Sequence, residues 1–324
     1  MRGQSIRDRV TILFPGALGD VLLALPALRA LRARHAAARL TVLVSERLRS
    51  LIALAGCADD VASLDGAELA RVLAGGARPP WLAPGAVVYS WFGVSDETVR
   101  TAIAAGAASA SFFRVERGPG DLHAAAAYAR AVRAPEDVPA LTAAGRIVPS
   151  PTARAGTLCA ELEGPALALH VGAGARAKRW HATGYAAVAT WWRAAGGTVL
   201  ALLGPAEVDD RPPPGARELR DWPLPDLAAV LARSNLYLGN DSGISHLAAA
   251  VGARGVVLFG TTDPERWHPF GNLVALRAAA SGADGIPLQA LPVERVIGAC
   301  RRALDRRAGD GREQSAPRPR GTLP

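Results

Sequence analysis

Short apolar runs alternate with segments of helical spacing along the chain, and most of these runs end in a turn rich in glycine or polar residues. Apolar strands joined by helices are typical of parallel βαβ units, because a parallel sheet is buried on both faces. The pattern therefore predicts an α/β protein built on parallel sheets. The runs expected to be strands are Val10–Phe14, Leu40–Val44, Ala86–Tyr89, Ala166–Val171, Thr198–Leu203, Leu236–Gly239 and Gly255–Phe259.

Helical segments are expected after several of these strands. Asp20 is expected to cap the first helix, and Pro26 to begin or kink its main part. The apolar residues that follow Asp20 recur at helical spacing, which supports a helix there. The other expected helices are Thr183–Ala195, Asp226–Arg233, Ser242–Val251 and Val293–Arg306.

The alternation is interrupted at about residues 145–157, where prolines and glycines predict a loop. With 324 residues the chain is long enough for two domains. We expect an N-terminal domain over 8–148, a linker over 149–160 and a C-terminal domain over 161–307. Parallel sheets bind ligands at the carboxyl ends of their strands, so a functional site is expected in a cleft between the domains.

The chain is basic, with a net charge of +8, and about half of this charge lies near its end. Residues 301–324 contain seven arginines against three acidic residues, and 308–324 are predicted to be a disordered basic tail. Such a tail is either simply solvated or attracted to an anionic membrane surface or an acidic acceptor. Nucleic acid is not expected as a partner, because no basic stripe is interleaved with aromatic residues.

Several classes of protein are excluded by the sequence pattern. The longest apolar stretch, 10–28, is interrupted by Pro15, Asp20 and Pro26, so neither a membrane span of roughly 20 residues nor a signal peptide is expected. The three cysteines are far apart, which is typical of a reduced, cytoplasmic compartment. The six histidines show no ligand spacing, so no metal and no cofactor are expected.

The strongest local motif is Asn240-Asp241-Ser242-Gly243, between an expected strand and a helix of small residues. The N–H groups of Ser242 and Gly243 at a helix start predict a phosphate site, and glycine lets a diphosphate approach closely. Asp241 would repel phosphate and is better suited to accept hydrogen bonds from sugar hydroxyls. Alternatively, Asp241 or Ser242 merely caps the helix. His246, one turn later, is either structural or catalytic.

Lys178 is the only lysine among 37 basic residues, and it lies in a turn rich in glycine that follows another expected strand. Lysine is a compact point charge on a slim stem, and it can neutralise a departing diphosphate. The alternative is that one lysine remained by chance. Gly172 and Gly174 do not complete a dinucleotide-binding motif, because no third glycine is in register.

Two carboxylates in other turns complete the candidate set. Asp20 follows the first strand, and from the wall opposite a bound donor it can deprotonate an acceptor hydroxyl. A plain helix cap explains Asp20 equally well. Glu207 follows the strand Thr198–Leu203 and is suited to hold a ribose, whereas Asp263 before Pro264 is expected to shape a turn.

Together these segments resemble glycosyltransferase family 9, the bacterial ADP-heptose lipopolysaccharide heptosyltransferases. The similarity runs from about Val10 to Arg277. His181 and Thr261 stand where that family usually has proline, so the loop geometry is expected to differ there. The motifs that carry the resemblance are Gly19-Asp20-Val21-Leu22 with Pro26-Ala27-Leu28, Lys178-Arg179-Trp180, Gly204-Pro205-Ala206-Glu207, Asn240-Asp241-Ser242-Gly243 with His246, and Phe259-Gly260 with Thr262-Asp263-Pro264.

The resemblance implies the GT-B fold, in which two Rossmann-like parallel-sheet domains face a central cleft. It implies an inverting, metal-independent transfer of a sugar, heptose from ADP-heptose, to a lipopolysaccharide-core or related glycan. The donor would lie in the second domain and the acceptor in the first, and the protein would be cytoplasmic with peripheral contact at the inner membrane. By position, Asp20 would be the base and Lys178 would bind the diphosphate. The implied donor-binding residues are Glu207 for the ribose, Asp241 for the sugar, Ser242 and Gly243 for the diphosphate, and His246 and Thr262 in the same pocket.

Three other functions are compatible with the sequence. One is a transferase that uses a different nucleotide sugar, and another is a sugar-nucleotide epimerase or dehydrogenase, which the incomplete glycine motif disfavours. The third is a non-catalytic protein that binds a nucleotide sugar and in which Asp20 has no role.

Overall fold

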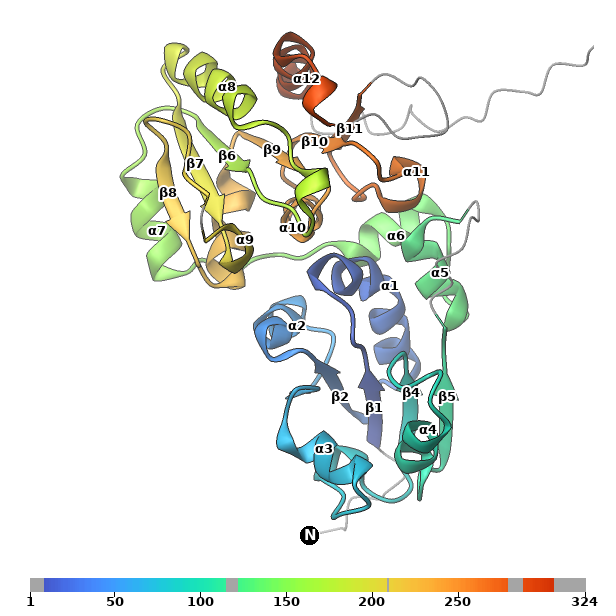
Figure 1. The fold of residues 1–324 in the computed structure, drawn as a ribbon. Coiled ribbons are helices and arrows are strands. Elements are labelled where there is room, and N and C mark those ends of the chain that lie inside the picture. Colours follow the sequence, from blue (N-terminus) through green and yellow to red (C-terminus); the bar gives the residue numbers. More distant parts are fainter. Residues whose placement is uncertain (1–8, 115–121, 209, 279–287, 306–324) are drawn as a thin grey trace, which may run out of the picture.

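The computed structural model describes residues 9–114, 122–208, 210–278 and 288–305. They form two domains, each built on one parallel sheet, with the first domain below the second in Figure 1. The expected basic tail over 308–324 lies outside the described residues. Within the described ranges, no helix combines the length and the apolar character that crossing a membrane requires.

The first domain contains a five-stranded sheet in the order β3-β2-β1-β4-β5, with every pair parallel. β1 lies at the centre, and four of its five residues are buried because helices cover both faces of the sheet. The strands are β1 (Arg9–Leu13), β2 (Arg39–Val44), β3 (Asp60–Ser63), β4 (Val87–Ser90) and β5 (Ser109–Phe112). The helices are α1 (Leu18–Arg34), α2 (Arg49–Ala55), α3 (Ala67–Leu73), α4 (Glu97–Ala104), α5 (Ala124–Ala131) and α6 (Val138–Gly145).

The second domain contains a six-stranded parallel sheet in the order β11-β10-β9-β6-β7-β8. This is the order of a dinucleotide-binding Rossmann sheet, and the direction of winding reverses between β6 and β9. Ligands bind such sheets at the carboxyl ends of the two strands at that reversal. The strands are β6 (Ala166–His170), β7 (Thr198–Leu203), β8 (Arg217–Arg220), β9 (Leu236–Asn240), β10 (Gly255–Phe259) and β11 (Leu273–Arg277). The helices are α7 (Ala153–Ala160), α8 (Ala182–Ala194), α9 (Leu224–Arg233), α10 (Gly243–Ala250), α11 (Pro264–Trp267) and α12 (Val293–Asp305).

The loop expected over 145–157 is shorter than predicted, because α7 occupies much of it. Thr152 caps α7 by accepting a hydrogen bond from the N–H of Ala155, at 3.1 Å. α6 packs on α1 of the first domain, whereas α7 packs on α9 of the second, so the chain crosses between the domains from one helix to the other. The prolines that suggested a long loop lie just before the cap of α7.

Four strands were not expected from the sequence: β3, β5, β8 and β11. Their residues are mostly half-buried or exposed, because these strands lie at the edges of the two sheets. A strand that is covered incompletely needs no continuous apolar run, and the sequence pattern is correspondingly weak. Pro26 lies inside α1 and therefore does not begin it, whereas the alternative that Pro26 kinks the helix stays a prediction.

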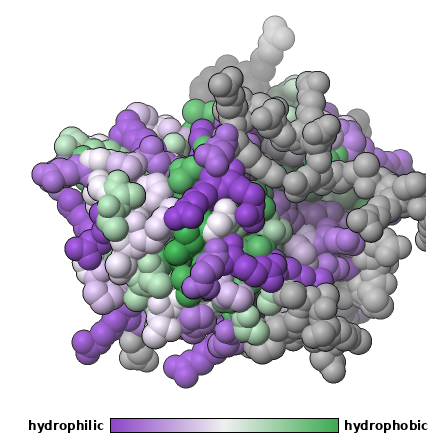
Figure 2. All heavy atoms as spheres, turned by 90° about the horizontal axis from the view of Figure 1, so that it is seen from above, coloured by the Kyte–Doolittle hydropathy of each residue, from purple (hydrophilic) through white to green (hydrophobic). Residues whose placement is uncertain are grey.

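The surface is mixed in character. Seen from above, hydrophilic side chains predominate, and hydrophobic side chains gather near the middle of the view (Figure 2). The two domains contact each other mainly where α1 packs on α10, and one hydrophobic cluster includes residues of both helices.

Candidate active site

A cavity of about 390 Å³ lies between the domains, where the N-terminal ends of α1 and α10 meet. It opens at the carboxyl ends of the central strands, which is where the sequence placed the site. Six of the predicted residues line it: Asp20, Lys178, Asp241, Ser242, Gly243 and His246. The other lining residues are Ala17, Gly19, Gly174, Arg266 and Trp267.

Lys178 and Asp241 form an ion pair in this cavity. The Lys178 Nζ donates a hydrogen bond to the Asp241 Oδ2 at 2.8 Å. The Asp241 side chain is only 8% exposed and that of Lys178 is 36% exposed, so the lysine can be reached from the cavity. The pair was not expected from the sequence, which assigned the two residues to different parts of a donor. Without a ligand, the aspartate compensates the lysine charge.

Asn240, the last residue of β9, fixes the turn that carries this lysine. Its Oδ1 accepts hydrogen bonds from the Trp180 N–H at 3.1 Å and the Tyr185 hydroxyl at 2.7 Å. Its Nδ2 donates to the carbonyl oxygens of Val171 and Gly172, both at 3.0 Å. The side chain is fully buried, and its polar atoms are all used. Asn240 is the first residue of the Asn240-Asp241-Ser242-Gly243 motif, but the sequence predicted no role for it.

Ser242 is the N-cap of α10, so the capping alternative is confirmed for this residue. Its Oγ accepts a hydrogen bond from the Ser245 N–H at 3.4 Å and lies 3.1 Å from the Nδ1 of His170. Burial lowers the pKa of His170 to about 4, so this imidazole is neutral at pH 7.

His246 lies on α10, one turn after the cap, and its ring lies close to Gly19 of α1. Burial lowers the pKa of His246 to about 4, and the nearby Asp241 carboxylate opposes this shift only in part. The imidazole is therefore neutral at pH 7 and adds no positive charge to the cavity.

Gly243 has a role that the sequence did not predict. A Cβ at Gly243 would lie 2.8 Å from the Cβ of Leu18, so the absence of a side chain lets α10 approach α1. A Cβ at Gly19 would likewise lie 3.1 Å from the ring of His246. The expectation that Gly243 serves the approach of a diphosphate remains a prediction, and the structure gives the residue a packing reason.

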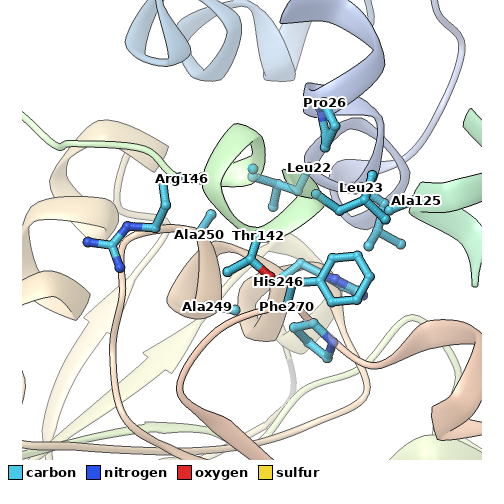
Figure 3. A pocket seen from close by; sticks show the side chains of 13 residues that line it. Leu22, Leu23, Pro26, Ala125, Thr142, Arg146, His246, Ala249, Ala250 and Phe270 are labelled. Atoms are coloured by element: carbon cyan, nitrogen blue, oxygen red, sulfur yellow. The ribbon is translucent and has the colours of Figure 1, made fainter. Parts of the chain in front are cut away.

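A second, small cavity of about 30 Å³ lies deeper between α1, α6 and α10. Figure 3 shows it from close by, with Leu22 and Leu23 of α1 near the rings of His246 and Phe270. His246 lines both cavities, so its ring belongs to the packing between the domains as well as to the candidate site.

Asp20 is the third residue of α1 and not its cap, which corrects the position expected from the sequence. The N-cap is Ala17, and the Ala17 N–H donates to the Asp20 Oδ2 at 3.1 Å. The Tyr128 hydroxyl of α5 donates to the other carboxylate oxygen, Oδ1, at 3.3 Å. Asp20 therefore satisfies a backbone N–H at the start of α1 and also faces the cavity.

Glu207 and Thr262 are not among the residues that line the cavity. The Glu207 carboxylate is buried and accepts a hydrogen bond from the Gly204 N–H at 2.9 Å. Its other oxygen lies 3.5 Å from the guanidinium of Arg179. A Cβ at Gly172 would lie 2.1 Å from a Glu207 oxygen, so Glu207 lies directly against the turn that leads to Lys178.

Arg266 and Trp267 line the cavity but were missed by the sequence analysis. They lie on α11, whose N-cap Asp263 accepts a hydrogen bond from the Glu265 N–H at 3.1 Å. The Arg266 guanidinium lies 5.6 Å from the centre of the Trp267 ring. The Asp263-Pro264 dipeptide signalled a turn, and the cap and the Pro at the first helical position were the available signal for a short helix beyond it.

The charges that face the cavity are balanced. Asp20 and Asp241 carry negative charge, and Lys178 and Arg266 carry positive charge. Among the residues that the structure describes, no group of three or more histidine, cysteine or acidic side chains is arranged to hold a metal ion.

Comparison with known families identifies a related group of proteins. The family model described as "Glycosyltransferase family 9 (heptosyltransferase)" matches residues 99–282. Among curated proteins, lipopolysaccharide heptosyltransferase 3 of Escherichia coli is 41% identical over 49 residues, which are 15% of this chain and 14% of that protein. The chain therefore aligns with only about a seventh of that relative's length.

Several solved structures share the fold over most of the chain. A glycosyltransferase family 9 protein from Veillonella parvula has a TM-score of 0.74 at 19% identity, over 92% of this chain and 97% of its own. The ADP-heptose lipopolysaccharide heptosyltransferase II of Escherichia coli has a TM-score of 0.71 at 17% identity, covering 91% and 98%. The Escherichia coli heptosyltransferase WaaC with ADP has a TM-score of 0.66 at 17% identity, covering 91% and 99%. These likenesses confirm the GT-B fold expected from the sequence.

Proposed function

Because the chain belongs to glycosyltransferase family 9, the heptosyltransferase family, we propose that it transfers heptose from ADP-heptose to a lipopolysaccharide-core or related glycan acceptor. The observation that carries this proposal is the shared cavity. A carboxylate from the first domain, Asp20, faces a lysine and a helix N-terminus from the second. This arrangement fits a base on the acceptor side and a diphosphate site on the donor side.

The donor is held by the second domain in this proposal. The N–H groups at the start of α10, at Ser242 and Gly243, bind the diphosphate, and Lys178 supplies the compensating positive charge. Asp241 accepts hydrogen bonds from the hydroxyls of the sugar. The lysine then exchanges part of its contact with Asp241 for the diphosphate, so that neither charge is left unpaired.

Glu207 and Thr262 are assigned to the ribose end of the donor and to its surroundings. Both lie on turns after strands of the second sheet, although neither lines the cavity. For Glu207 to hold a ribose, its carboxylate must keep the Gly204 N–H on one oxygen and use the other.

The reaction is a direct displacement with inversion. Asp20 takes the proton of an acceptor hydroxyl while that oxygen attacks the anomeric carbon from the face opposite the nucleotide. The bond between the anomeric carbon and the diphosphate breaks, and ADP leaves with the electron pair. Lys178 and the α10 N–H groups stabilise the charge that develops on the leaving diphosphate, and we assign no metal to this step.

The acceptor and the location follow from the same proposal. The protein would act in the cytoplasm with peripheral contact at the inner membrane, where a glycolipid acceptor is found. The contact is assigned to the basic tail over 308–324, which lies outside the described residues. Nucleic acid is not assigned as a partner.

Calorimetric titration tests the donor. ADP-heptose should bind more tightly than ADP, UDP or UDP-sugars, both with and without a chelator. Preference for a UDP-sugar would overturn the heptose assignment, and binding that depends on metal would overturn the metal-independent mechanism. Absence of binding to any of these ligands would contradict the donor site itself.

Transfer assays test the two catalytic assignments. Lys178→Ala should lower kcat by about 30- to 1,000-fold, because a charge-assisted contact to a leaving diphosphate is worth about 2–4 kcal/mol. Arg176→Ala is the matched control, since Arg176 is an exposed cation in the same turn and does not line the cavity. A fall of less than tenfold for Lys178→Ala would refute the leaving-group role, and Lys178→Arg tests whether lysine itself is needed.

Asp20→Asn should abolish transfer while ADP-heptose still binds, because the amide cannot accept a proton. If the variant transfers sugar like the unaltered protein, Asp20 is not the base. Normal donor binding without any transfer in the unaltered protein, across a panel of glycan acceptors, would instead favour a non-catalytic nucleotide-sugar-binding protein.

A further inference from the structure

The proposed base is held by a tyrosine that lies outside the cavity. The Tyr128 hydroxyl is 3.3 Å from the Asp20 Oδ1, and the Ala17 N–H binds the other carboxylate oxygen. Tyr128 is 3% exposed and is not among the residues that line the cavity, so it is placed to act on substrate through its neighbours, Asp20 among them. We propose that Tyr128 is a positioning residue that orients the Asp20 carboxylate. This inference rests on the proposed function.

The tyrosine ring packs against two other aromatic rings. Its ring centre lies 5.3 Å from that of Phe14 and 6.4 Å from that of Trp91, in both cases edge to face. Phe14 directly follows β1 and begins the segment that leads to α1, and α5 packs along α1. The hydroxyl can therefore reach Asp20 in one orientation without ordering a mobile side chain when substrate binds.

The helix that carries Tyr128 is also anchored to the second domain. The Nδ1 of His123, the N-cap of α5, accepts a hydrogen bond from the Ala125 N–H at 3.1 Å. The Nε2 then carries the proton and donates to the carbonyl oxygen of His268 at 2.8 Å. The His123 ring also packs on Phe270, with 4.1 Å between the ring centres. The position of the Tyr128 hydroxyl therefore depends on the contact between the two domains.

Two donors to one carboxylate have a defined chemical effect. They fix the orientation of the carboxylate, and they leave lone pairs on its oxygens to accept a proton from the acceptor hydroxyl. The other groups that face Asp20 across the cavity are Lys178, Asp241 and Arg266, together with the neutral ring of His246. These charged side chains remain unchanged when Tyr128 is replaced, so the contribution of its hydroxyl can be measured separately.

Tyr128→Phe removes the hydroxyl and keeps the ring that packs on Phe14 and Trp91. In steady-state transfer assays, kcat at neutral pH should fall about tenfold, while the donor KM changes by less than twofold. A purely structural role would lower the Tm but would not lower kcat selectively at an unchanged donor KM.

Tyr89→Phe is the matched control. Tyr89 stacks in the same aromatic cluster, and its hydroxyl lies 2.9 Å from the His35 Nε2 rather than near Asp20. This variant should keep the kcat of the unaltered protein. If Tyr128→Phe also keeps the unaltered kcat, Tyr128 does not position the base.

A second variant keeps the inference testable if Tyr128→Phe fails to fold. Ala17→Pro removes the other donor to Asp20, and the φ of −70° at Ala17 is compatible with proline. It should likewise lower kcat, because the carboxylate then keeps only one donor, and an unaltered kcat would contradict the inference. Asp20→Asn separates the two proposals. If that variant is active, the base assignment fails, whereas an inactive Asp20→Asn with an unaltered Tyr128→Phe refutes only the positioning role.

Discussion

Asn240 is the residue through which stability and the candidate site can be tested together. Its amide joins the end of β9 to the turn that carries Lys178 by three hydrogen bonds, and a fourth joins it to Tyr185 of α8. Asn240→Ala leaves four buried groups without these partners, namely two donors and two carbonyl oxygens. At about 1 kcal/mol for each bond, the free energy of unfolding of the second domain should fall by about 4 kcal/mol. That is a large part of the roughly 5–15 kcal/mol that stabilises a typical protein.

Thermal unfolding measures this loss. For a domain of this size, about 1 kcal/mol lowers the Tm by roughly 2–4 °C, so Asn240→Ala should lower it by about 8–16 °C. Tyr185→Phe is the companion variant, because it removes only the hydroxyl that donates to Asn240 and should lower the free energy of unfolding by about 1 kcal/mol. Below the Tm, Asn240→Ala should also raise the KM for donor, since the Lys178 turn loses its attachment to β9.

The result that would refute this reasoning is a small effect. If Asn240→Ala is no more destabilising than Tyr185→Phe and binds donor normally, the amide does not hold the turn. Water that enters the vacated space can replace some of the bonds. A loss of about 2 kcal/mol with an altered donor KM would therefore still agree with the argument.

Two further predictions concern the contact between the domains and the buried histidines. Gly243→Ala should lower the free energy of unfolding by about 1–3 kcal/mol, because the new Cβ would lie 2.8 Å from that of Leu18, and Leu18→Ala should restore part of the loss in melting experiments. Acid should destabilise the protein through His123, His170 and His246, whose pKa values burial lowers from 6.5 to about 4. In the unfolded chain these histidines bind protons at a higher pH than they do in the folded chain. The free energy of unfolding therefore has its full value above pH 6.5 and falls as the pH drops towards 4. Each histidine should cost about 2 kcal/mol at pH 5, and denaturant unfolding measured between pH 7 and pH 5 would contradict this if stability stayed constant.

Much of the fold could be predicted because the central strands are buried on both faces. The runs at Thr198–Leu203 and Gly255–Phe259 match the observed strands to the residue, since complete burial demands apolar residues along the whole strand. Edge strands such as β3 are only partly buried and need no continuous apolar run, so the sequence pattern did not predict them. The N-cap of α1 is Ala17, three residues before the predicted cap Asp20. Asp20 lies inside the helix and accepts a hydrogen bond from the Ala17 N–H.

The sequence indicated which residues lie at the candidate site better than it indicated which residues contact one another there. Asp20, Lys178 and Asp241 stand in turns after strands, and parallel sheets bring such turns to one edge. The Lys178–Asp241 pair and the Tyr128–Asp20 contact join residues 63 and 108 positions apart, and no local pattern encodes a distance of that kind. Arg266 and Trp267 escaped notice for a related reason, because only the three-dimensional position of α11 places them at the cavity.

The way these residues are held shows how the site depends on both domains. Asp20 is held by Ala17 and Tyr128 of its own domain, and Lys178 is held by Asp241 and by the Asn240-bound turn of the other. Apart from the His123–His268 contact that anchors α5 to the second domain, each half of the site is ordered within its own domain, and what remains to be set is the distance between them. That distance depends on α1 and α10, which approach closely only because Gly19 and Gly243 lack side chains. In the proposed mechanism a small-residue contact beside the cavity thus has a direct chemical consequence, since a shift of about 1 Å between the proposed base and the donor is enough to cost about 100-fold in rate.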